Sequence, residues 1–413
     1  MRATKCVVQT YGDDGLHDLL GECLTVTYNA VNYGQKNGVS NRKGMGTFYR
    51  SLKQTGLPSC YKVAAITRAC AVLTSRMKSE KRGVETKHPQ PLRPMICVLS
   101  GFFITMKGRL FIPLRRNQYF DVQLNRYVQQ TLTQKKIRSL TITPDSLSFC
   151  YSEDVKLMSV KTVFGVDRNE KNLTFGNPEK VTQINLSKTV RIKQTTREIV
   201  GSFKRSDVRI RRRLARKYWR RANNRTNQML HAATNYMVEN AVANDAAFAL
   251  EDLTDIKKLY RKGNGQGREY RFRLNSWPYW KARMMLGYKS AWKGISVIPL
   301  TKSETYGSSS VHSTCGEKLH NPEKGDVEHR RMLWCQTCNK WVDRDANATV
   351  NLSQRGLARF ASSHPTPKSR SQQADFKAEE KGLANEAMVQ EPGTPVILKV
   401  DASKLTLRHF PKS

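Results

Sequence analysis

From residue 161 onward, short apolar segments alternate with polar turns and long helical stretches, and this order restricts the fold more than any other feature. VFGVD, NLTFG and VTQINL come first, and each has the length and apolar content of a buried strand. A long helical region is expected from about 190 to 243. AFALEDL and ISVIPL are then two further buried strands, with a helix around 277–290 between them. Strands and helices in this order indicate a layered α/β domain.

Carboxylates stand where several of these segments begin or end. Asp167 ends the first strand, Glu251 ends AAFALE, and Asp345 begins the helical segment DANATVNLSQRGL. Each has an ordinary explanation when taken alone, because a strand-end aspartate often starts a turn and Asp345 could serve only as a helix N-cap. Asp252 alternates to the other strand face from Glu251. Asp343 is the alternative to Asp345. We prefer Asp345 because it starts the helix, whereas Asp343 would belong to the end of the Cys- and His-containing segment before the helix.

Taken together, the three acids point to chemistry at phosphorus. The order of strands and helices is the one expected of a ribonuclease H-like α/β fold, in which strand ends and a helix start can meet at one rim of the sheet. Asp167, Glu251 and Asp345 can there hold two Mg²⁺ ions about 4 Å apart, which activate water and stabilise the leaving oxygen. Hard oxygen ligands suit Mg²⁺. We therefore predict a Mg²⁺-dependent phosphodiester hydrolase with these three residues as catalytic and metal-binding groups.

Two ligand pairs, HSTC and CQTC, lie about twenty residues apart between the last strand and the last helix. Paired ligands on tight knuckles build a tetrahedral zinc site, and a set of three cysteines and one histidine closes the coordination sphere. A stray histidine with free thiols is the alternative explanation. His320 and His329 could replace the first histidine, but neither has two-residue spacing to a cysteine. The predicted ligands of one structural Zn²⁺ are His312, Cys315, Cys335 and Cys338.

The formal charge of the chain is +37, from 71 Lys and Arg against 34 Asp and Glu. Such an excess needs anions to neutralise it, and nucleic acid is the usual partner because each cation set against a phosphate releases a counterion. No apolar segment reaches the roughly 18 residues that would span a membrane. The start lacks an apolar core, so we expect no secretory signal. The other six of the nine cysteines are scattered singly, which suits a reducing cytosol.

The densest positive charge lies in KRSDVRIRRRLARKYWRR, residues 204–221, which hold ten Lys or Arg and one Asp. A solvated charged face is the usual explanation of a mixed run. A net charge of +9 in eighteen residues favours contact with phosphates instead. The predicted nucleic-acid-binding residues are Lys204, Arg205, Arg209, Arg211, Arg212, Arg213, Arg216, Lys217, Arg220 and Arg221.

The region before residue 161 has a different texture. Two stretches of helical apolar spacing suggest a small helical unit over roughly 13–80, and a basic stretch with three prolines at 79–95 suggests a linker. Strand-like segments over 96–155, including a hairpin pair, predict a small β-barrel or sheet. The tail from about 361 is rich in Ser, Pro, Lys and Gln and has no sustained periodicity, so we expect it to be largely disordered.

The succession GVDRNEKN, ALEDL, HSTCG…CQTC and DRDANATVNL resembles TnpB, the insertion-sequence-encoded relative of the miniature type V CRISPR effectors. The resemblance covers about 161–360. In that family the first strand supplies the aspartate here numbered 167, the fourth supplies the glutamate 251, and DRD-x-N-A supplies the aspartate 345. The family's zinc element is usually CxxC…CxxC after a serine-rich approach, which Ser308 to Ser310 match. This chain departs from the pattern by placing His312 where the first cysteine would stand.

The resemblance also implies a domain layout, since the helical unit within a β-barrel is similar to the family's recognition and wedge domains. Its predicted parts are a wedge-like β-barrel over 1–12 and 81–160, a helical recognition domain over 13–80, a RuvC-like nuclease domain over 161–300 and 343–360, a zinc-binding target nucleic-acid-binding module over 301–342, and a disordered tail over 361–413.

The resemblance implies an RNA-guided DNA endonuclease of an insertion sequence, with two Mg²⁺ and one Zn²⁺. Its partners would be a guide RNA encoded near the gene and target double-stranded DNA beside a short flanking motif, with no membrane and no small-molecule substrate. It would work in the cytoplasm of a prokaryote, on the nucleoid. The alternatives are a guide-independent nuclease or transposition-associated DNA-binding protein using the same acids, and a guided binder that does not cut.

Overall fold

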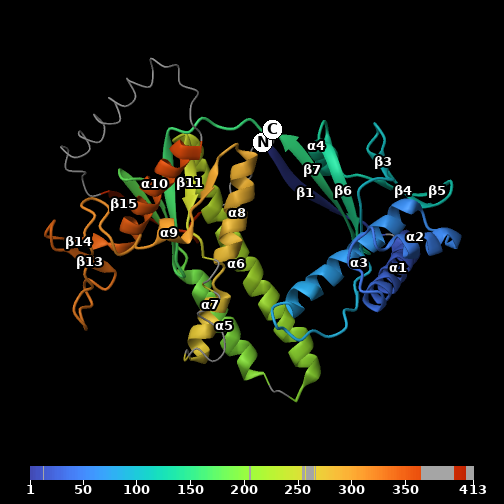
Figure 1. Ribbon diagram of the computed structural model, residues 1–413, viewed down its shortest axis with the longest axis horizontal. Helices are drawn as coiled ribbons and strands as arrows, with labels where there is room; N and C mark the ends of the chain where they lie inside the picture. Colours follow the sequence, from blue (N-terminus) through green and yellow to red (C-terminus); the bar gives the residue numbers. More distant parts are fainter. Residues whose placement is uncertain are drawn as a thin grey trace. The chain divides into compact units, whose positions relative to one another are not determined.

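A computed structural model describes the chain as two compact units, residues 2–154 and residues 155 onward with Met1. Figure 1 follows the elements of both along the chain. The residues that the structure describes are 1–12, 14–203, 206–253, 256, 265, 267–363 and 395–405.

The unit 2–154 combines two antiparallel sheets with a group of helices. One sheet has the order β1-β7-β6-β2 and the other the order β3-β4-β5. The closed barrel and the division of this region into wedge and recognition domains stay predictions. The strands are β1 (Arg2–Thr10), β2 (Ile96–Val98), β3 (Phe103–Ile104), β4 (Arg109–Arg115), β5 (Gln118–Gln123), β6 (Lys136–Ile142) and β7 (Ser146–Asp154), and the α-helices are α1 (His17–Lys36), α2 (Gly46–Ser51), α3 (Ser59–Glu80) and α4 (Arg126–Leu132).

The second unit is built on one mixed sheet with the order β12-β11-β8-β9-β10-β15. The strands β8, β9 and β10, which come first in the chain, form an antiparallel meander. The strand β11 then pairs in parallel with β8, and β12 pairs in parallel with β11. This is the strand succession predicted from the sequence. The strands are β8 (Thr162–Arg168), β9 (Asn172–Gly176), β10 (Lys180–Asn185), β11 (Ala246–Leu250), β12 (Val297–Pro299) and β15 (Val396–Asp401).

Helices cover both faces of this sheet, which explains why every residue of the interior strand β11 is apolar and buried. Phe248 and Leu250 of β11 pack into a cluster with residues of the long helix α6, whereas Ala247 and Ala249 of the same strand pack with Leu352. The alternation follows from the period of two along a strand. The helices are α5 (Ser187–Ser202), α6 (Ala215–Ala243), α7 (Arg268–Ser276), α8 (Tyr279–Trp292), α9 (Lys302–Thr305) and α10 (Arg344–Ser363), and a π-helix at Ile210–Leu214 leads into α6.

The contact between α10 and β8 is unusually close and fixes the start of α10 over the sheet. A Cβ atom on Gly165 would lie 2.0 Å from the backbone oxygen of Thr349, so only glycine fits there. Ser353 of α10 also donates a hydrogen bond of 2.6 Å to the backbone oxygen of Val163. Because backbone meets backbone at this crossing, the first turn of α10 is held at a defined place relative to the end of β8.

The expectation of a disordered tail over 361–413 is wrong for one segment. Val396–Asp401 form β15, which pairs in parallel with β10 from Lys180↔Val396 to Asn185↔Asp401. The edge of β10 offers backbone partners that local composition does not reveal. Residues 364–394 and 406–413 of the predicted tail lie outside the described residues. Within the described part of the chain, no helix has the length and apolarity that crossing a membrane requires.

Candidate active site and zinc module

The structure brings the three predicted acids together at one edge of the sheet. Asp167 is the penultimate residue of β8, and Glu251 directly follows β11. The two strands are parallel neighbours with Val166 opposite Leu250, so their carboxyl ends meet at the same edge. Asp345 comes from the first turn of α10, which crosses β8 at this end.

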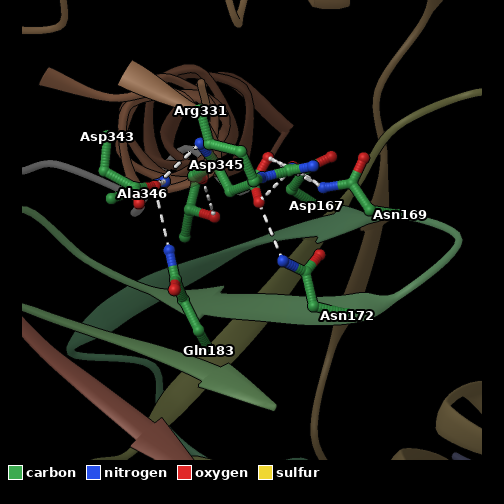
Figure 2. A network of polar contacts seen from close by, with 9 residues as sticks. Asp167, Asn169, Asn172, Gln183, Arg331, Asp343, Asp345 and Ala346 are labelled. Atoms are coloured by element: carbon green, nitrogen blue, oxygen red, sulfur yellow. Dashed lines mark hydrogen bonds and ion pairs between the residues drawn. The ribbon is translucent and has the colours of Figure 1, made fainter. Parts of the chain in front are cut away.

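Asn169, in the turn after β8, connects the two aspartates, and Asn172, at the start of β9, adds a contact to Asp345 (Figure 2). The Nδ2 atom of Asn169 donates to Asp167 Oδ2 at 2.7 Å and to Asp345 Oδ1 at 3.0 Å. The Nδ2 atom of Asn172 donates to the other oxygen of Asp345 at 2.8 Å. The carboxylates of Asp167 and Asp345 are therefore within reach of one amide group. Neither asparagine was a predicted site residue, although both stand in the segment GVDRNEKN.

Glu251 is held by the residue that follows Asp167. The backbone N–H of Arg168 donates to Glu251 Oε1 at 3.2 Å, and its Nη2 donates to the backbone oxygen of Glu251 at 2.6 Å. The Arg168 side chain is 2% exposed, and its Nε atom has no hydrogen-bond partner and lies 3.7 Å from Glu251 Oε1. Arg168 thus holds the backbone of Glu251 with its guanidinium and the Glu251 carboxylate with its own backbone N–H.

The acids are buried against one another, which makes their shared negative charge costly. Burial raises the pKa of Asp167 well above its ordinary value, and the charges of Glu251 and Asp345 raise it further. Burial also raises the pKa of Glu251, although Arg168 opposes that shift. Carboxylates in this state gain most from a bound cation, because a cation favours the charged form.

Arg331 supplies one positive charge to the cluster, from the residue directly before β13 (Met332–Cys335). Its Nη2 lies 2.5 Å from Asp345 Oδ2, and the Arg331 side chain is 56% exposed whereas Asp345 is 4% exposed. No sequence signal separated this arginine from the many others in the chain. Only the folding of the segment onto α10 shows that it reaches the site (Figure 2).

Asp343, not Asp345, caps the helix α10. Its Oδ1 accepts hydrogen bonds from the backbone N–H groups of Asp345 at 3.0 Å and Ala346 at 2.9 Å, and from Gln183 Nε2 at 2.9 Å. The expectation that Asp345 starts the helix is off by one residue, because α10 begins at Arg344. A favoured N-cap aspartate accepts hydrogen bonds from the backbone N–H groups two and three residues further along the chain, as Asp343 does. Asp345 is thereby free of capping and faces the other acids.

The four predicted zinc ligands also come together. One ligand atom from each lies within 4.8 Å of all the others. His312 Nδ1 is 3.2 Å from Cys315 Sγ and 3.4 Å from Cys338 Sγ, and Cys315 Sγ is 3.5 Å from Cys335 Sγ. A tetrahedral zinc site with sulfur ligands at about 2.3 Å has sulfur–sulfur edges of roughly 3.8 Å, so this donor set fits the ion.

The alternative histidines lie outside this cluster, in the segment of residues 301–342 for which the sequence predicts a zinc module. His320 pairs through its backbone with Trp334, and His329 stacks on Trp341 with ring centroids 4.0 Å apart and contacts Asp326 at 2.9 Å. Both tryptophans belong to the two-stranded ribbon of β13 (Met332–Cys335) and β14 (Lys340–Asp343).

The zinc module is tied to the helix that carries Asp345. Asn347 Oδ1 accepts from the backbone N–H of Ser313 at 2.8 Å, and its Nδ2 donates to the backbone oxygen of Val311 at 2.7 Å. Asn351, one turn further along α10, donates to the same oxygen at 2.8 Å. The knuckle that bears His312 is therefore fixed on the first two turns of α10.

The predicted basic segment is only partly described. Lys204 and Arg205 lie outside the described residues, and nothing can be said of the Arg211 side chain. The other seven predicted contacts are exposed along the π-helix and the start of α6, which suits contact with phosphates and suits a solvated face equally. They are Arg209, Arg212, Arg213, Arg216, Lys217, Arg220 and Arg221.

Fold and site together define an α/β protein with a carboxylate cluster at the edge of its sheet and a Cys/His module beside it. The family model described as "Cas12f1-like, TNB domain" matches residues 279–352. A TnpB-like protein of Methanocaldococcus jannaschii is 28% identical over 230 residues, which cover 53% of this chain and 78% of that protein.

A solved structure of a Cas12f1–sgRNA–target DNA complex matches with a TM-score of 0.53 at 12% identity, covering 82% of this chain and 81% of the other. At that identity the likeness concerns the fold alone. With the family model and the archaeal relative, it confirms the predicted resemblance to the TnpB family.

Proposed function

We propose that this protein is an RNA-guided DNA endonuclease of an insertion sequence, which cleaves target DNA beside a short flanking motif by two-metal phosphodiester hydrolysis. The observation that carries the proposal is the meeting of Asp167, Glu251 and Asp345, from three distant segments, in one partly buried network of hydrogen bonds. Asp345 is buried and the other two acids are half-buried, and carboxylates gathered in this way cost free energy unless cations compensate them.

Asp167, Glu251 and Asp345 would hold the Mg²⁺ ions. The donor set fits, since all three offer hard oxygen atoms and each belongs to an element whose position is fixed by packing. When bound, the ions supply a water of lowered pKa and neutralise charge that develops on the phosphate oxygens.

The remaining side chains of the site would orient these acids. Arg168 would hold Glu251, Asn169 would hold the carboxylates of Asp167 and Asp345, and Asn172 would add a contact to Asp345. Arg331 is the exposed cation of the site, and its guanidinium can contact a substrate phosphate as well as Asp345. Such preorganisation of charged groups is the main contribution a protein makes to phosphoryl chemistry.

The cluster of His312, Cys315, Cys335 and Cys338 would hold one structural Zn²⁺. Four protein ligands leave no open position, so the ion would stabilise the knuckles rather than take part in hydrolysis. Its position beside α10 supports a role in holding Asp345 and Arg331 in place.

The proposed partners are a guide RNA encoded near the gene and a double-stranded DNA target. The charge of +37 supports nucleic-acid partners, and the matched Cas12f1 structure is a complex with sgRNA and target DNA. Base pairing with the guide would select the target, while the protein would read only the flanking motif. The protein would then act in the cytoplasm of a prokaryote, on its nucleoid.

The proposal is tested by purifying the chain from its native locus and sequencing the RNA that stays bound. We expect a discrete, nuclease-protected RNA from beside the gene, and we expect the complex to cut matching DNA in Mg²⁺. Asp167→Ala should abolish cutting while leaving nucleic-acid binding largely intact. Heterogeneous RNA that salt removes would refute the guided function, and cutting by the Asp167→Ala protein would refute the assigned site.

A further inference from the structure

Two cysteines face each other across the first and the last strand of the unit 2–154. The strands β1 and β7 lie side by side and pair antiparallel without a shift of register (Figure 1). This register places Cys6 of β1 directly opposite Cys150 of β7. Both side chains therefore leave the same face of the sheet. The two residues stand near opposite ends of the unit in sequence, so only the fold brings them together.

The hydrogen bonds beyond the two ends of this ladder show which kind of pair the cysteines form. At one end, the backbone N–H of Tyr11 donates to the backbone oxygen of Asp145 at 3.2 Å. At the other end, the amino group of Met1 donates to the backbone oxygen of Val155 at 2.8 Å, and the N–H of Val155 donates back at 2.7 Å. Hydrogen-bonded pairs alternate with non-hydrogen-bonded pairs along an antiparallel ladder. The cysteine pair is five places from each end pair, so it is a non-hydrogen-bonded pair.

A pair of this kind has the spacing that a disulfide needs. The opposing Cα atoms of a non-hydrogen-bonded pair are about 4.5 Å apart, and their side chains are closer than at the other positions. Disulfides join residues whose Cα atoms are about 4.4–6.8 Å apart. The thiols also influence each other, since burial raises the pKa of the Cys6 thiol and the neighbouring Cys150 raises it further. The separation is at the short end of the range, which makes such a bond more easily reduced.

Reagents from solution can reach this pair. Cys6 is exposed and Cys150 is partly exposed, and β1 is the edge strand of the sheet β1-β7-β6-β2. Cys97 is also exposed, but it belongs to β2 at the opposite edge of the same sheet, where it pairs with Thr141 of β6. Cys97 is therefore a cysteine of similar exposure that the register does not place opposite another thiol.

We propose that Cys6 and Cys150 form a reversible disulfide that fastens β1 to β7 when the surrounding thiol pool becomes oxidised. The oxidant is a small-molecule disulfide such as oxidised glutathione. The more exposed Cys6, as thiolate, attacks one sulfur atom of the oxidant, which forms a mixed disulfide and releases one thiol. The Cys150 thiolate then attacks the Cys6 sulfur and releases the second thiol. The two protons of the cysteines end on the released thiols, and two electrons pass from the protein to the oxidant.

The bond acts on the strand that is held least firmly in this sheet, because an edge strand has a paired neighbour on one side. A cross-link between Cys6 and Cys150 closes a loop that contains almost the whole unit 2–154. Closing a long loop removes much conformational freedom from the unfolded chain. Oxidation therefore slows the separation of β1 from β7 and raises the melting temperature.

The test uses the full-length chain, which is purified with reductant and then equilibrated with oxidised glutathione. After the remaining thiols are blocked with N-ethylmaleimide, the chain is digested with trypsin and Glu-C without reduction, because cleavage after Glu22 separates Cys6 from Cys23. We expect mass spectrometry to find two peptides joined through Cys6 and Cys150, which reductant separates. Glutathione retained on both cysteines, or Cys6 joined to a different cysteine, would overturn the proposal.

Two variants separate this bond from general oxidation. Cys6→Ser removes it, and the matched control Cys97→Ser replaces another exposed strand cysteine of the same sheet. We expect the change in Tm on oxidation to be more positive by roughly 5 °C in the wild type and in Cys97→Ser than in Cys6→Ser. Hydrogen exchange of the β1 amides should slow in the first two proteins alone. Equal responses of Cys6→Ser and the wild type would show that another site carries the effect, and the proposal would fail.

Discussion

Arg168 directly follows Asp167 in the chain, yet its side chain reaches across to the next strand and donates from Nη2 to the backbone oxygen of Glu251 at 2.6 Å. Each of the two neighbouring strands β8 and β11 thus carries one acid at the sheet edge. The buried side chain of Arg168 links the two strand ends. Burial lowers the pKa of the Arg168 guanidinium, although Glu251 and Asp167 favour its charged form. This arginine is a positioning residue for the second acid.

Replacing Arg168 should therefore impair metal binding before it impairs folding. In Arg168→Met, the backbone oxygen of Glu251 loses its partner, which costs about 1–3 kcal/mol of unfolding free energy. We expect the Mg²⁺ concentration for half-maximal cleavage to rise, and Arg168→Lys to restore it in part. A variant that loses stability but keeps the wild-type Mg²⁺ dependence would contradict the positioning role.

Asp343 and Asp345 should respond in opposite ways to mutation. Asp343→Ala removes the N-cap of α10 and should lower the unfolding free energy by about 1 kcal/mol while keeping most of the cleavage. Asp345→Asn should abolish cleavage with little loss of stability, because it removes a buried negative charge. Thermal melts and cleavage rates of both variants check this. Retained cutting by Asp345→Asn would exclude that residue from the site.

Removal of zinc should reduce DNA cleavage, although the zinc ligands are separate from the three acids. Metal analysis of the purified chain should find one Zn²⁺ per molecule, and Cys335→Ser should abolish its binding. We expect loss of cleavage as well, because Asn347 ties the His312 knuckle to the helix that carries Asp345. The control is Cys97→Ser, at an exposed cysteine outside the cluster. Full activity in zinc-free protein would show that the module does not support the site.

Lys289 should make the stability of the second unit depend on pH. Burial lowers the pKa of Lys289 to about 7, although Glu239 favours the charged form, and its Nζ donates to the backbone oxygen of His231 and to Thr234 Oγ1. The unfolded chain has a lysine pKa near 10.4, so between these values it binds more protons than the folded chain. The unfolding free energy should therefore rise with pH from about 7 to about 10.

The measurement is a series of denaturant melts of wild type and Lys289→Met across that pH range. The contribution of this lysine can reach about 1.4 kcal/mol per pH unit. We expect the difference in stability between wild type and variant to shift in favour of wild type as pH rises. A difference that stays constant with pH would mean that Lys289 is protonated in the folded chain.

The sequence by itself determined the elements that carry the chemistry and their order. Apolar runs of strand length can only be buried, and VFGVD, AFALE and ISVIPL became β8, β11 and β12. Paired ligands with fixed spacing can meet with little help from the rest of the chain, and the four predicted zinc ligands lie together in the structure. These features depend on local spacing and burial, which a sequence displays directly.

The tertiary structure alone decided which polar residues serve the acids. Asn169 and Arg168 reach partners in distant parts of the chain, and Arg331 reaches Asp345 from 14 residues away, with nothing in their spacing to mark them. Backbone pairing likewise recruited Val396–Asp401 to the edge of β10 from a segment whose composition favours disorder. Hydrogen bonds and charge pairs between distant segments depend on how the elements pack, and a single sequence records that packing only indirectly.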